Sequence, residues 1–324
     1  MTALETQGLT RIFGGGSTLF GGRRQAVHAV MDVDLAVAEG ETLGIVGESG
    51  CGKSTLARML VGLDRPTGGA IRLGGDDMAG LVRREPRAIP RRIQYVFQDP
   101  VSSLNPRKTI RQALEAPMRR LLGLAPERRR ERLAELMDAV GLRDAFLERY
   151  PHEFSGGQAQ RIAIARALAA EARIMVLDEP VSALDVSIQA QVLNLLARLK
   201  REFGLTYVFI SHDLSVVESV SDRVAVMYFG RVVETGRARE LFRAPRHPYT
   251  ALLMRSAPVP GARHIEPEAE PAELPDPTDP PGGCAFASRC PRVVDRCRAE
   301  RPPLMLARGR TQAACWRPHD EPAP

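Results

Sequence analysis

The sequence predicts an α/β fold with a mostly parallel core sheet and an antiparallel β-subdomain at the N-terminus. Helical patterns separate short apolar runs, as expected for buried parallel strands in repeated βα units. These runs are Thr42–Val46, Ile93–Phe97, Ile174–Leu177 and Thr206–Ile210. The first run leads into a glycine-rich turn and then a helical stretch, and residues 1–40 alternate apolar and polar side chains. A chain of 324 residues can form one such domain and a smaller appendage.

The composition is that of a globular protein. Hydrophobic residues make up 44% of the chain and charged residues 26%. No apolar run approaches the ~18 residues that a transmembrane helix needs. The first residues, MTALETQGLTRIF, lack the charged and apolar regions of a signal peptide. We therefore expect a chain that stays in the cytoplasm and reaches a membrane only through other subunits.

The net charge of +6 does not by itself indicate a nucleic-acid-binding protein. The densest basic run, ERRRERLAEL, has glutamates among its arginines and an amphipathic helical pattern, which is typical of a solvated helix face. We expect no nucleic-acid partner. Only three of the 45 basic residues are lysines, so the chemistry of Lys53, Lys108 and Lys200 needs an explanation.

The main domain is expected to cover residues 1–257. A glycine-rich insert at residues 14–22 indicates a loop between the N-terminal strands. Residues of about 99–170 have mostly helical patterns and predict a helical subdomain on the sheet. Two short strand patterns, Val224–Met227 and Val232–Glu234, close this domain.

A linker and a tail follow the main domain. Residues 258–281 contain eight prolines and six acidic residues, a composition that cannot form a core. Residues 282–324 form a small C-terminal extension that holds four of the five cysteines.

Residues 47–54 match the phosphate-loop pattern G-x-x-x-x-G-K-[ST]. They follow a strand and precede the helical stretch STLARMLVGL, which is the context that the pattern needs. Glycines let backbone N–H groups point at phosphate, and the helix N-terminus favours an anion. Lys53 would reach the β- and γ-phosphates of ATP, and Ser54 would ligate Mg²⁺. The expected ATP contacts are Gly47, Glu48, Ser49, Gly50, Cys51, Gly52, Lys53, Ser54 and Thr55.

Two acids follow the apolar run Ile174–Leu177. Asp178 is placed to hold the Mg²⁺ shell at the strand end, and Glu179 can polarise the attacking water. Paired acids at a strand end often only cap a helix, but their position downstream of a phosphate loop favours the catalytic interpretation.

The segment FSGGQ, residues 154–158, resembles the signature of the ABC ATPase family, and the resemblance covers about residues 1–255. Gln98 ends the strand pattern IQYVFQ, where the family has its Q-loop. His212 follows TYVFIS, where the family has its switch histidine. Phe13 is the candidate for the aromatic side chain that stacks on adenine, with Phe20 as the alternative. Residues 182–185 resemble the family's D-loop. They are Ser182, Ala183, Leu184 and Asp185.

The resemblance implies a role for each motif. Glu179 would be the general base, His212 would hold the γ-phosphate and the water, and Gln98 would bind Mg²⁺ together with Ser54 and Asp178. In this family the signature opens a helix and meets the ATP that a partner domain holds, in a head-to-tail dimer. The residues expected to do so here are Ser155, Gly156, Gly157 and Gln158.

Several stretches resemble the oligopeptide/dipeptide importer branch, in particular the second of its two paired ATPases. They are FQDPVSSLNPR, RYPHEFSGGQAQRIAIARAL, DEPVSALDVSIQAQVLNLL and HPYTALLMRSAP. The resemblance implies a second ATPase subunit, two permease subunits and an extracytoplasmic solute-binding protein as partners. It also implies a peripheral position on the cytoplasmic face of the inner membrane. Nickel, glutathione and sugar importers share this branch, so the cargo stays open, and a non-transport ABC ATPase is the more distant alternative.

Four cysteines lie in the extension: Cys284, Cys290, Cys297 and Cys315. In a cytoplasmic protein such a group argues for metal rather than disulfides. Zinc ribbons usually carry C-x-x-C pairs, and this tail has none, which favours a [4Fe–4S] cluster. The importer branch has a similar cysteine pattern, for which cluster binding is the implied interpretation. Zinc and no metal remain the alternatives.

Overall fold

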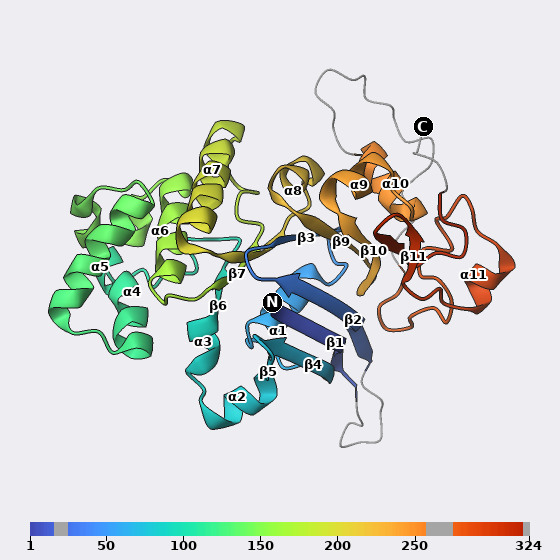
Figure 1. The fold of residues 1–324 in the computed structure, drawn as a ribbon, viewed down its shortest axis with the longest axis horizontal. Helices are drawn as coiled ribbons and strands as arrows, with labels where there is room; N and C mark the ends of the chain where they lie inside the picture. The colour runs from blue at the N-terminus through green and yellow to red at the C-terminus, as the bar shows by residue number, and fades with distance from the viewer. Residues whose placement is uncertain (16–24, 257–274, 320–324) are drawn as a thin grey trace.

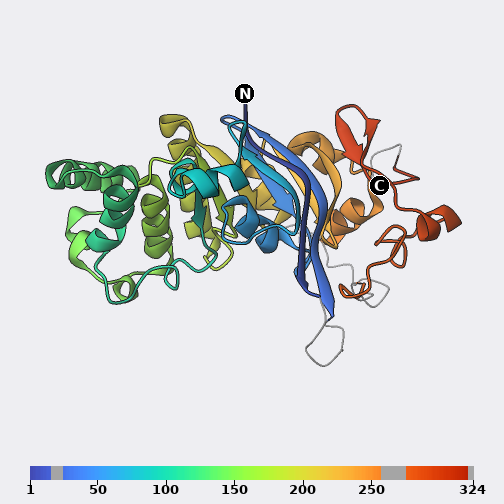
Figure 2. The ribbon, with the colours of Figure 1, turned by 90° about the horizontal axis from the view of Figure 1, so that it is seen from below.

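The computed structural model describes residues 1–15, 25–256 and 275–319. Within these ranges the chain forms an eight-stranded core sheet and a four-stranded N-terminal sheet (Figure 1). The helical subdomain lies at one end of the molecule and the C-terminal extension at the other, with the N-terminal sheet between them (Figure 2). The predicted α/β class is therefore confirmed.

The centre of the core sheet is parallel, in the order β9-β3-β8-β7-β6. Every residue of β3, β7 and β8 is buried. Strands covered on both faces have apolar side chains throughout, which is why the sequence shows them as continuous apolar runs. Their bounds are β3 Thr42–Val46, β6 Ile93–Val96, β7 Ile174–Asp178, β8 Thr206–Ile210 and β9 Arg223–Tyr228.

The N-terminal sheet is antiparallel, in the order β2-β1-β4-β5. The second half of β2 alternates buried and exposed residues, as expected when one face of a sheet packs on a core. Most of the glycine-rich insert at residues 14–22 lies outside the described residues. The bounds are β1 Thr2–Gly14, β2 Ala26–Ala38, β4 Gly68–Leu73 and β5 Asp76–Asp77.

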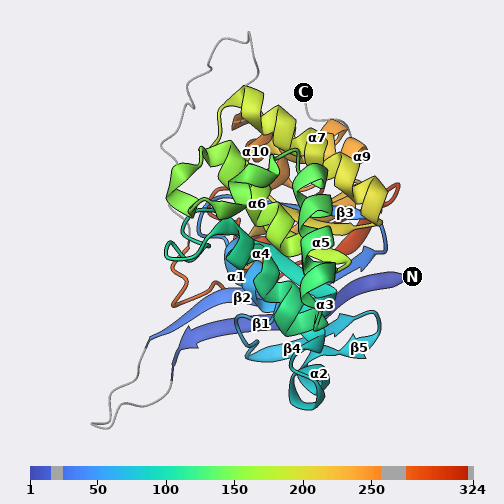
Figure 3. The same cartoon turned by 90° about the vertical axis from the view of Figure 1, so that its left-hand side faces the viewer.

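The helical subdomain contains three α-helices and three short helical turns within the predicted range (Figure 3). Thr109 caps α4 through a capping box with Gln112. Arg166 of α6 donates a hydrogen bond to the Ser103 carbonyl at 2.6 Å, which ties the segment after β6 to the subdomain. The bounds are α4 Ile110–Pro117, η1 Met118–Leu122, α5 Pro126–Ala139, η2 Asp144–Glu148, η3 Pro151–Glu153 and α6 Gly156–Leu168.

The other helices connect strands of the two sheets or close the main domain. None of the helices in the described ranges is both long enough and apolar enough to span a bilayer. Their bounds are α1 Lys53–Leu60, α2 Met78–Arg84, α3 Ala88–Arg92, α7 Val186–Phe203, α8 Leu214–Val220, α9 Ala238–Arg243 and α10 Pro248–Ser256.

The extension is packed on the main domain. Its strand β12 (Thr311–Ala313) pairs with β10 (Arg231–Arg237), so the core sheet continues into the tail through β11 (Met305–Arg308). Phe286 is 1% exposed, and its ring lies 5.4 Å from the rings of both Tyr228 and Tyr249. The extension, which also holds α11 (Asp295–Ala299), therefore shares the core of the main domain.

Candidate nucleotide-binding site

The predicted catalytic residues meet in a cleft at the carboxyl ends of β3, β6, β7 and β8, where parallel α/β sheets place their ligands. The cleft has a volume of about 770 Å³. Its lining comes from the phosphate loop, from the ends of these strands, from β2 and from the end of the linker. The lining residues are Val27, His28, Ala29, Ser49, Gly50, Gly52, Lys53, Ser54, Thr55, Gln98, Glu179, His212, Phe229, Gly230, Pro275 and Pro277.

The phosphate loop needs its glycines for space as well as for backbone conformation. Gly47 has φ 155°, and a Cβ there would lie 2.2 Å from the Met227 carbonyl oxygen. Gly52 has φ 102°, and a Cβ there would lie 2.2 Å from the Ala29 carbonyl oxygen. Gly52 is also the N-cap of α1, so no side chain covers the first N–H groups of that helix. The loop therefore presents free amides and a helix N-terminus, a donor set that fits a phosphate group.

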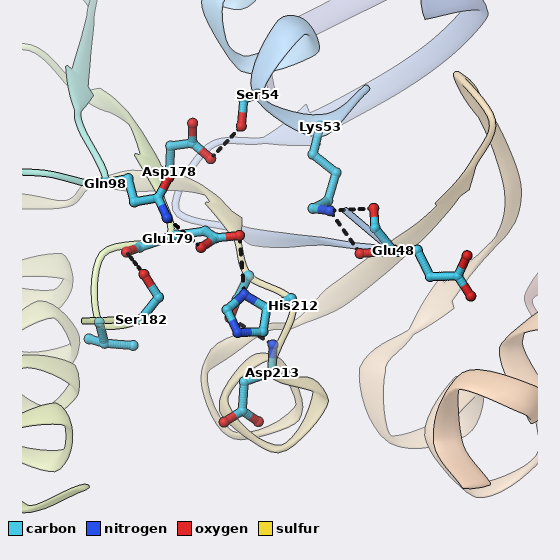
Figure 4. A network of polar contacts seen from close by, with 12 residues as sticks. Glu48, Lys53, Ser54, Gln98, Asp178, Glu179, Ser182, His212 and Asp213 are labelled. Atoms are coloured by element: carbon cyan, nitrogen blue, oxygen red, sulfur yellow. Dashed lines mark hydrogen bonds and ion pairs between the residues drawn. The ribbon is translucent and has the colours of Figure 1, made fainter. Parts of the chain in front are cut away.

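Lys53 spans the loop from its C-terminal end. The side chain is 6% exposed, and Nζ donates hydrogen bonds to the carbonyl oxygens of Gly47 at 2.7 Å and Glu48 at 2.9 Å (Figure 4). These two hydrogen bonds hold the ammonium group inside the loop. Lys53 is thus positioned to contact phosphates that the loop amides surround.

Ser54 and Asp178 lie next to each other across the cleft. The Ser54 hydroxyl donates to Asp178 Oδ1 at 3.3 Å, and the Tyr95 hydroxyl donates to Asp178 Oδ2 at 2.5 Å. Burial raises the pKa of Asp178, while these hydrogen bonds and Lys53 act in the opposite direction. A carboxylate beside a hydroxyl is the hard-oxygen pair that fits Mg²⁺. Sequence reasoning missed Tyr95, although its place in β6, three residues before Gln98, is a usable signal.

Glu179 is the centre of a second group of polar side chains. Gln98 Nε2 donates to Glu179 Oε2 at 3.0 Å, and His212 Nδ1 lies 3.1 Å from Glu179 Oε1 (Figure 4). Glu179 has φ 48°, which is uncommon for a residue with a side chain. Its N–H bonds the Ile210 carbonyl at 2.9 Å, so β8 holds this backbone in place. Gln98, Glu179 and His212 therefore face one space in the cleft, as the sequence predicted.

The signature segment lies apart from this cleft. Of the residues that the structure describes, none of Ser155, Gly156, Gly157 and Gln158 belongs to the cleft lining. The segment opens α6, with the Ser155 N–H donating to Gln158 Oε1 at 3.2 Å, and Ser155 and Gly156 are exposed. An exposed helix N-terminus outside its own chain's cleft is free to meet an anion held by another molecule.

The D-loop residues 182–185 lie against the signature segment. A Cβ at Gly156 would approach Leu184 Cδ2 to 3.2 Å, and a Cβ at Gly157 would approach Ile188 Cγ2 to 2.5 Å. Asp185 caps α7 by accepting a hydrogen bond from the Ile188 N–H at 3.0 Å. The two signature glycines thus allow α6 to pack closely on the start of α7.

The structure describes one of the two candidates for the aromatic residue that stacks on adenine. Phe13 is 37% exposed, with the Arg11 guanidinium 4.4 Å from its ring centroid. Val27, which pairs with Phe13 across the sheet, lines the cleft, whereas Phe13 is absent from the lining found among the described residues. Phe20 lies outside the described residues. The stacking of Phe13 on adenine therefore stays a prediction.

Cys51 is buried within the loop at 1% exposure. Burial raises the pKa of its thiol, which keeps it protonated and unreactive at neutral pH. The side chain serves as a small apolar group in the core of the loop.

The structure does not support the metal site predicted for the cysteines of the extension. All four are free thiols, and no three His, Cys, Asp or Glu side chains within residues 1–15, 25–256 and 275–319 converge as metal ligands. Burial raises the pKa of Cys315 to about 11, and the Sγ atom accepts a hydrogen bond from the Arg317 N–H at 3.4 Å. The predicted [4Fe–4S] cluster is therefore not supported by the described residues.

The neighbouring arginines point to other partners. Arg289 binds Glu48, Arg292 lies 2.9 Å from His319 Nδ1, and Arg296 binds Glu300.

Two family models match the chain. Residues 30–182 match "ABC transporter", and residues 233–297 match "Oligopeptide/dipeptide transporter, C-terminal region". The second match includes part of the extension.

Curated relatives are similar over most of their length. The chain is 47% identical to the di/tripeptide transport ATP-binding protein DppF of Pseudomonas aeruginosa, over 97% of each chain. It is 49% identical to the oligopeptide transport ATP-binding protein OppF of Salmonella typhimurium, over 86% of this chain and 85% of that protein. A probable peptide ABC transporter ATP-binding protein of Sinorhizobium fredii is 52% identical, over 89% and 82%.

Solved structures of ATP-binding cassettes share the fold. A dimeric cassette in a post-hydrolysis state, bound to ADP and Pi, matches with a TM-score of 0.64 and 30% identity. The match covers 73% of this chain and 99% of the cassette.

Proposed function

Since the chain belongs to the ABC transporter ATP-binding proteins, in the branch of oligopeptide and dipeptide transport, we propose that it powers the import of di- and oligopeptides by hydrolysing ATP. The observation that carries the proposal is the single cleft shared by Lys53, Gln98, Glu179 and His212. The relatives named for peptide transport, together with the C-terminal match, support peptides as the cargo.

The phosphate end of ATP would lie on the loop. Backbone N–H groups of the loop and the start of α1 would bind the phosphate oxygens, with Lys53 between the β- and γ-phosphates. Mg²⁺, when bound, supplies positive charge to the phosphate oxygens, and Ser54, Asp178 and Gln98 are the residues that would hold it. The hydrogen bond between Ser54 and Asp178 supports this assignment, because both side chains offer oxygen to the same point.

Glu179 would act as the general base. Its carboxylate would take the proton of the attacking water as the water oxygen bonds to the γ-phosphorus and the bond from that phosphorus to the leaving ADP oxygen breaks. Gln98 and His212 each contact one carboxylate oxygen, which fixes its direction. His212 is more exposed than Glu179 and would bind the γ-phosphate from the open side.

Complete catalysis would need a second ATPase subunit. Ser155 and Gly156 are exposed, and the signature residues 155–158 would complete the cleft of a partner in a head-to-tail dimer. We propose that the other partners are two permease subunits and an extracytoplasmic solute-binding protein. The chain would sit peripherally on the cytoplasmic face of the inner membrane, and the helical subdomain would transmit closure to the permeases. The proposal includes ATP and Mg²⁺ and leaves out the iron–sulfur cluster predicted at Cys284, Cys290, Cys297 and Cys315, because the described residues contain no group of side chains that could hold a metal ion.

Purification of the tagged chain from its native membranes in mild detergent tests this function. We expect a second ATPase, two permeases and a binding protein to be retained, as identified by mass spectrometry. ATP hydrolysis by this complex should rise when peptide-loaded binding protein is added, and the matched Glu179→Gln complex should not respond. If binding protein loaded with nickel, glutathione or sugar stimulates hydrolysis and peptide does not, that compound is the cargo instead of peptide. Recovery of ribosomal or DNA-repair proteins without a permease would contradict transport itself.

A further inference from the structure

The C-terminal extension contacts the phosphate loop directly. Arg289 Nη1 donates to Glu48 Oε2 at 2.8 Å, and Arg289 Nη2 donates to Glu48 Oε1 at 2.9 Å. The two residues are 241 positions apart in the sequence, and their side chains are only 11% and 28% exposed. A bidentate, largely buried pair of this kind fixes the direction of both side chains and is stronger than a surface ion pair.

Each polar group of Glu48 is held. Its N–H donates to the Tyr249 hydroxyl at 2.9 Å, and its carbonyl oxygen accepts from Lys53 Nζ at 2.9 Å. Its carboxylate binds Arg289. Tyr249 is fully buried on α10. Residues that follow β10 in the chain therefore provide two of these three restraints on the loop.

Arg289 is itself positioned by aromatic rings. The guanidinium carbon lies 5.8 Å from the ring centroid of Tyr228 and 5.7 Å from that of Phe286. Phe286 belongs to the extension and Tyr228 to β9, so the guanidinium bridges the two parts of the chain. A planar guanidinium can pack against the rings while two of its N–H groups bind the carboxylate, a geometry that an ammonium group does not have.

The same region also reaches the other end of the cleft. Pro275 and Pro277, at the end of the linker, line the cleft beside Val27 and His28. The His28 N–H donates to the Pro277 carbonyl at 2.9 Å. The chain after residue 274 therefore contacts the nucleotide cleft at two separate points.

We propose that the C-terminal extension positions the phosphate loop for nucleotide, with Arg289 acting through Glu48 as the positioning residue. Arg289 holds the loop in one conformation and neutralises a carboxylate that would otherwise repel the phosphates of ATP. ATP binding then requires a docked extension, although the extension supplies no group to the reacting atoms. Loss of Arg289 lowers the population of the binding-competent loop, which weakens the apparent affinity.

A double-mutant cycle on the full-length chain tests the proposal. The affinity for a fluorescent ATP analogue is measured for wild type, Arg289→Ala, Glu48→Gln and the double variant. We expect Arg289→Ala to weaken binding about tenfold in the wild-type chain, the effect of losing a charge-assisted hydrogen-bond pair. In the Glu48→Gln background the same change should weaken binding about twofold or less, since the carboxylate it acts through is gone.

Two further variants separate positioning from stability. Arg289→Lys should recover only part of the affinity, because an ammonium group keeps the charge and loses the fork. Arg310→Ala removes an exposed arginine from the β11–β12 turn and should bind like wild type. Circular dichroism confirms that each variant is folded. In the assembled transporter, Arg289→Ala should raise KM for ATP while leaving kcat nearly unchanged.

An equal loss of affinity for Arg289→Ala in both backgrounds would overturn the proposal, since Arg289 would then act on stability alone. Unchanged affinity in the wild-type background would overturn it as well. The binding assay uses the isolated chain and no cargo, so its outcome is independent of whether the transporter carries peptides.

Discussion

Glu179 combines an uncommon backbone conformation with two side-chain partners. Its φ of 48° costs free energy that the surrounding strands must offset, and such residues are frequent at active sites. Gln98 and His212 occupy separate carboxylate oxygens at 3.0 and 3.1 Å. The backbone therefore aims the carboxylate, and the two partners leave little freedom for it to rotate.

Glu179→Gln should stop turnover without preventing ATP binding. The amide keeps the size and most hydrogen bonds of the carboxylate but cannot accept a proton. We expect turnover to fall by about 10²- to 10⁴-fold, the range for loss of a general base. Steady-state hydrolysis and nucleotide binding on the same preparation measure both effects. Turnover within a few-fold of wild type would remove Glu179 as the base.

At the scale of elements, the contact between α6 and α7 depends on a missing side chain. Gly157 lies where a Cβ would be 2.5 Å from Ile188 Cγ2. This glycine therefore allows the signature helix to pack closely on α7. The sequence motif alone predicts only its role in phosphate binding. The sequence is sufficient to identify the motif, but no local sequence pattern predicts the contact with α7.

Gly157→Ala should displace α6 from α7 and impair hydrolysis at the partner's site, since overpacking typically costs about 1–3 kcal/mol. Adding Ile188→Ala makes room for the new methyl group and should restore part of the activity of the assembled complex. If the double variant is no better than Gly157→Ala, the defect comes from the phosphate contact rather than from packing.

Glu234 ties β10 to the turn before α10. It is fully buried, and its carboxylate accepts hydrogen bonds from the N–H groups of Arg246 at 2.7 Å and His247 at 2.8 Å. Burial raises its pKa to about 7 in the folded chain, above the ordinary value of 4.5. The folded state therefore holds an extra proton between these values, and Glu234 makes the chain less stable as pH rises through this window.

Glu234→Gln removes this titration. The melting temperature of the variant minus that of wild type should increase from pH 5 to pH 7.5, because only the wild type loses this contribution to stability as the pH rises. Burial lowers the pKa of His247 to about 3, which affects both proteins and cancels in the comparison. A difference that is constant across this pH range would show that Glu234 does not titrate in it.

The strands differ in how far the sequence predicts them. β3 and β8 match the predicted bounds, because strands buried on both faces are mostly apolar. β7 exceeds its prediction by one residue, the charged Asp178. β4 was not predicted, since it begins with two glycines that have low strand propensity. Gly69 is nevertheless required there, because a Cβ would lie 2.4 Å from the Gly8 carbonyl oxygen of β1.

For the whole molecule, the sequence predicts residues that line the cleft better than it predicts what the extension contacts. Residues 47–54 and Asp178–Glu179 are local patterns next to strands, so a linear pattern identifies them. Tyr249 and Arg289 reach Glu48 only through the tertiary fold, across 201 and 241 residues. The cysteine spacing suggested a cluster, but spacing along the chain does not fix where four thiols lie in space.

Phe286→Ala should undock the extension. The side chain is 1% exposed among Tyr228 and Tyr249, and its loss should lower the free energy of unfolding by about 3–5 kcal/mol. Leu306→Ala, at a position 68% exposed on β11, is the matched control and should leave the melting temperature unchanged. Similar melting temperatures for both variants would contradict the shared core.

The pairing of Glu48 with Arg289 also sets an order of events during synthesis. The phosphate loop leaves the ribosome early, whereas its arginine follows 241 residues later, when most of the chain has been made. Domains fold as their segments emerge, so the core sheet can form before this long-range contact closes. A nascent chain that stops within the linker would carry every ATP motif of its sequence and still hold the Glu48 carboxylate without its cation. Tight nucleotide binding would then arise only after the extension has been made and has docked on the phosphate loop.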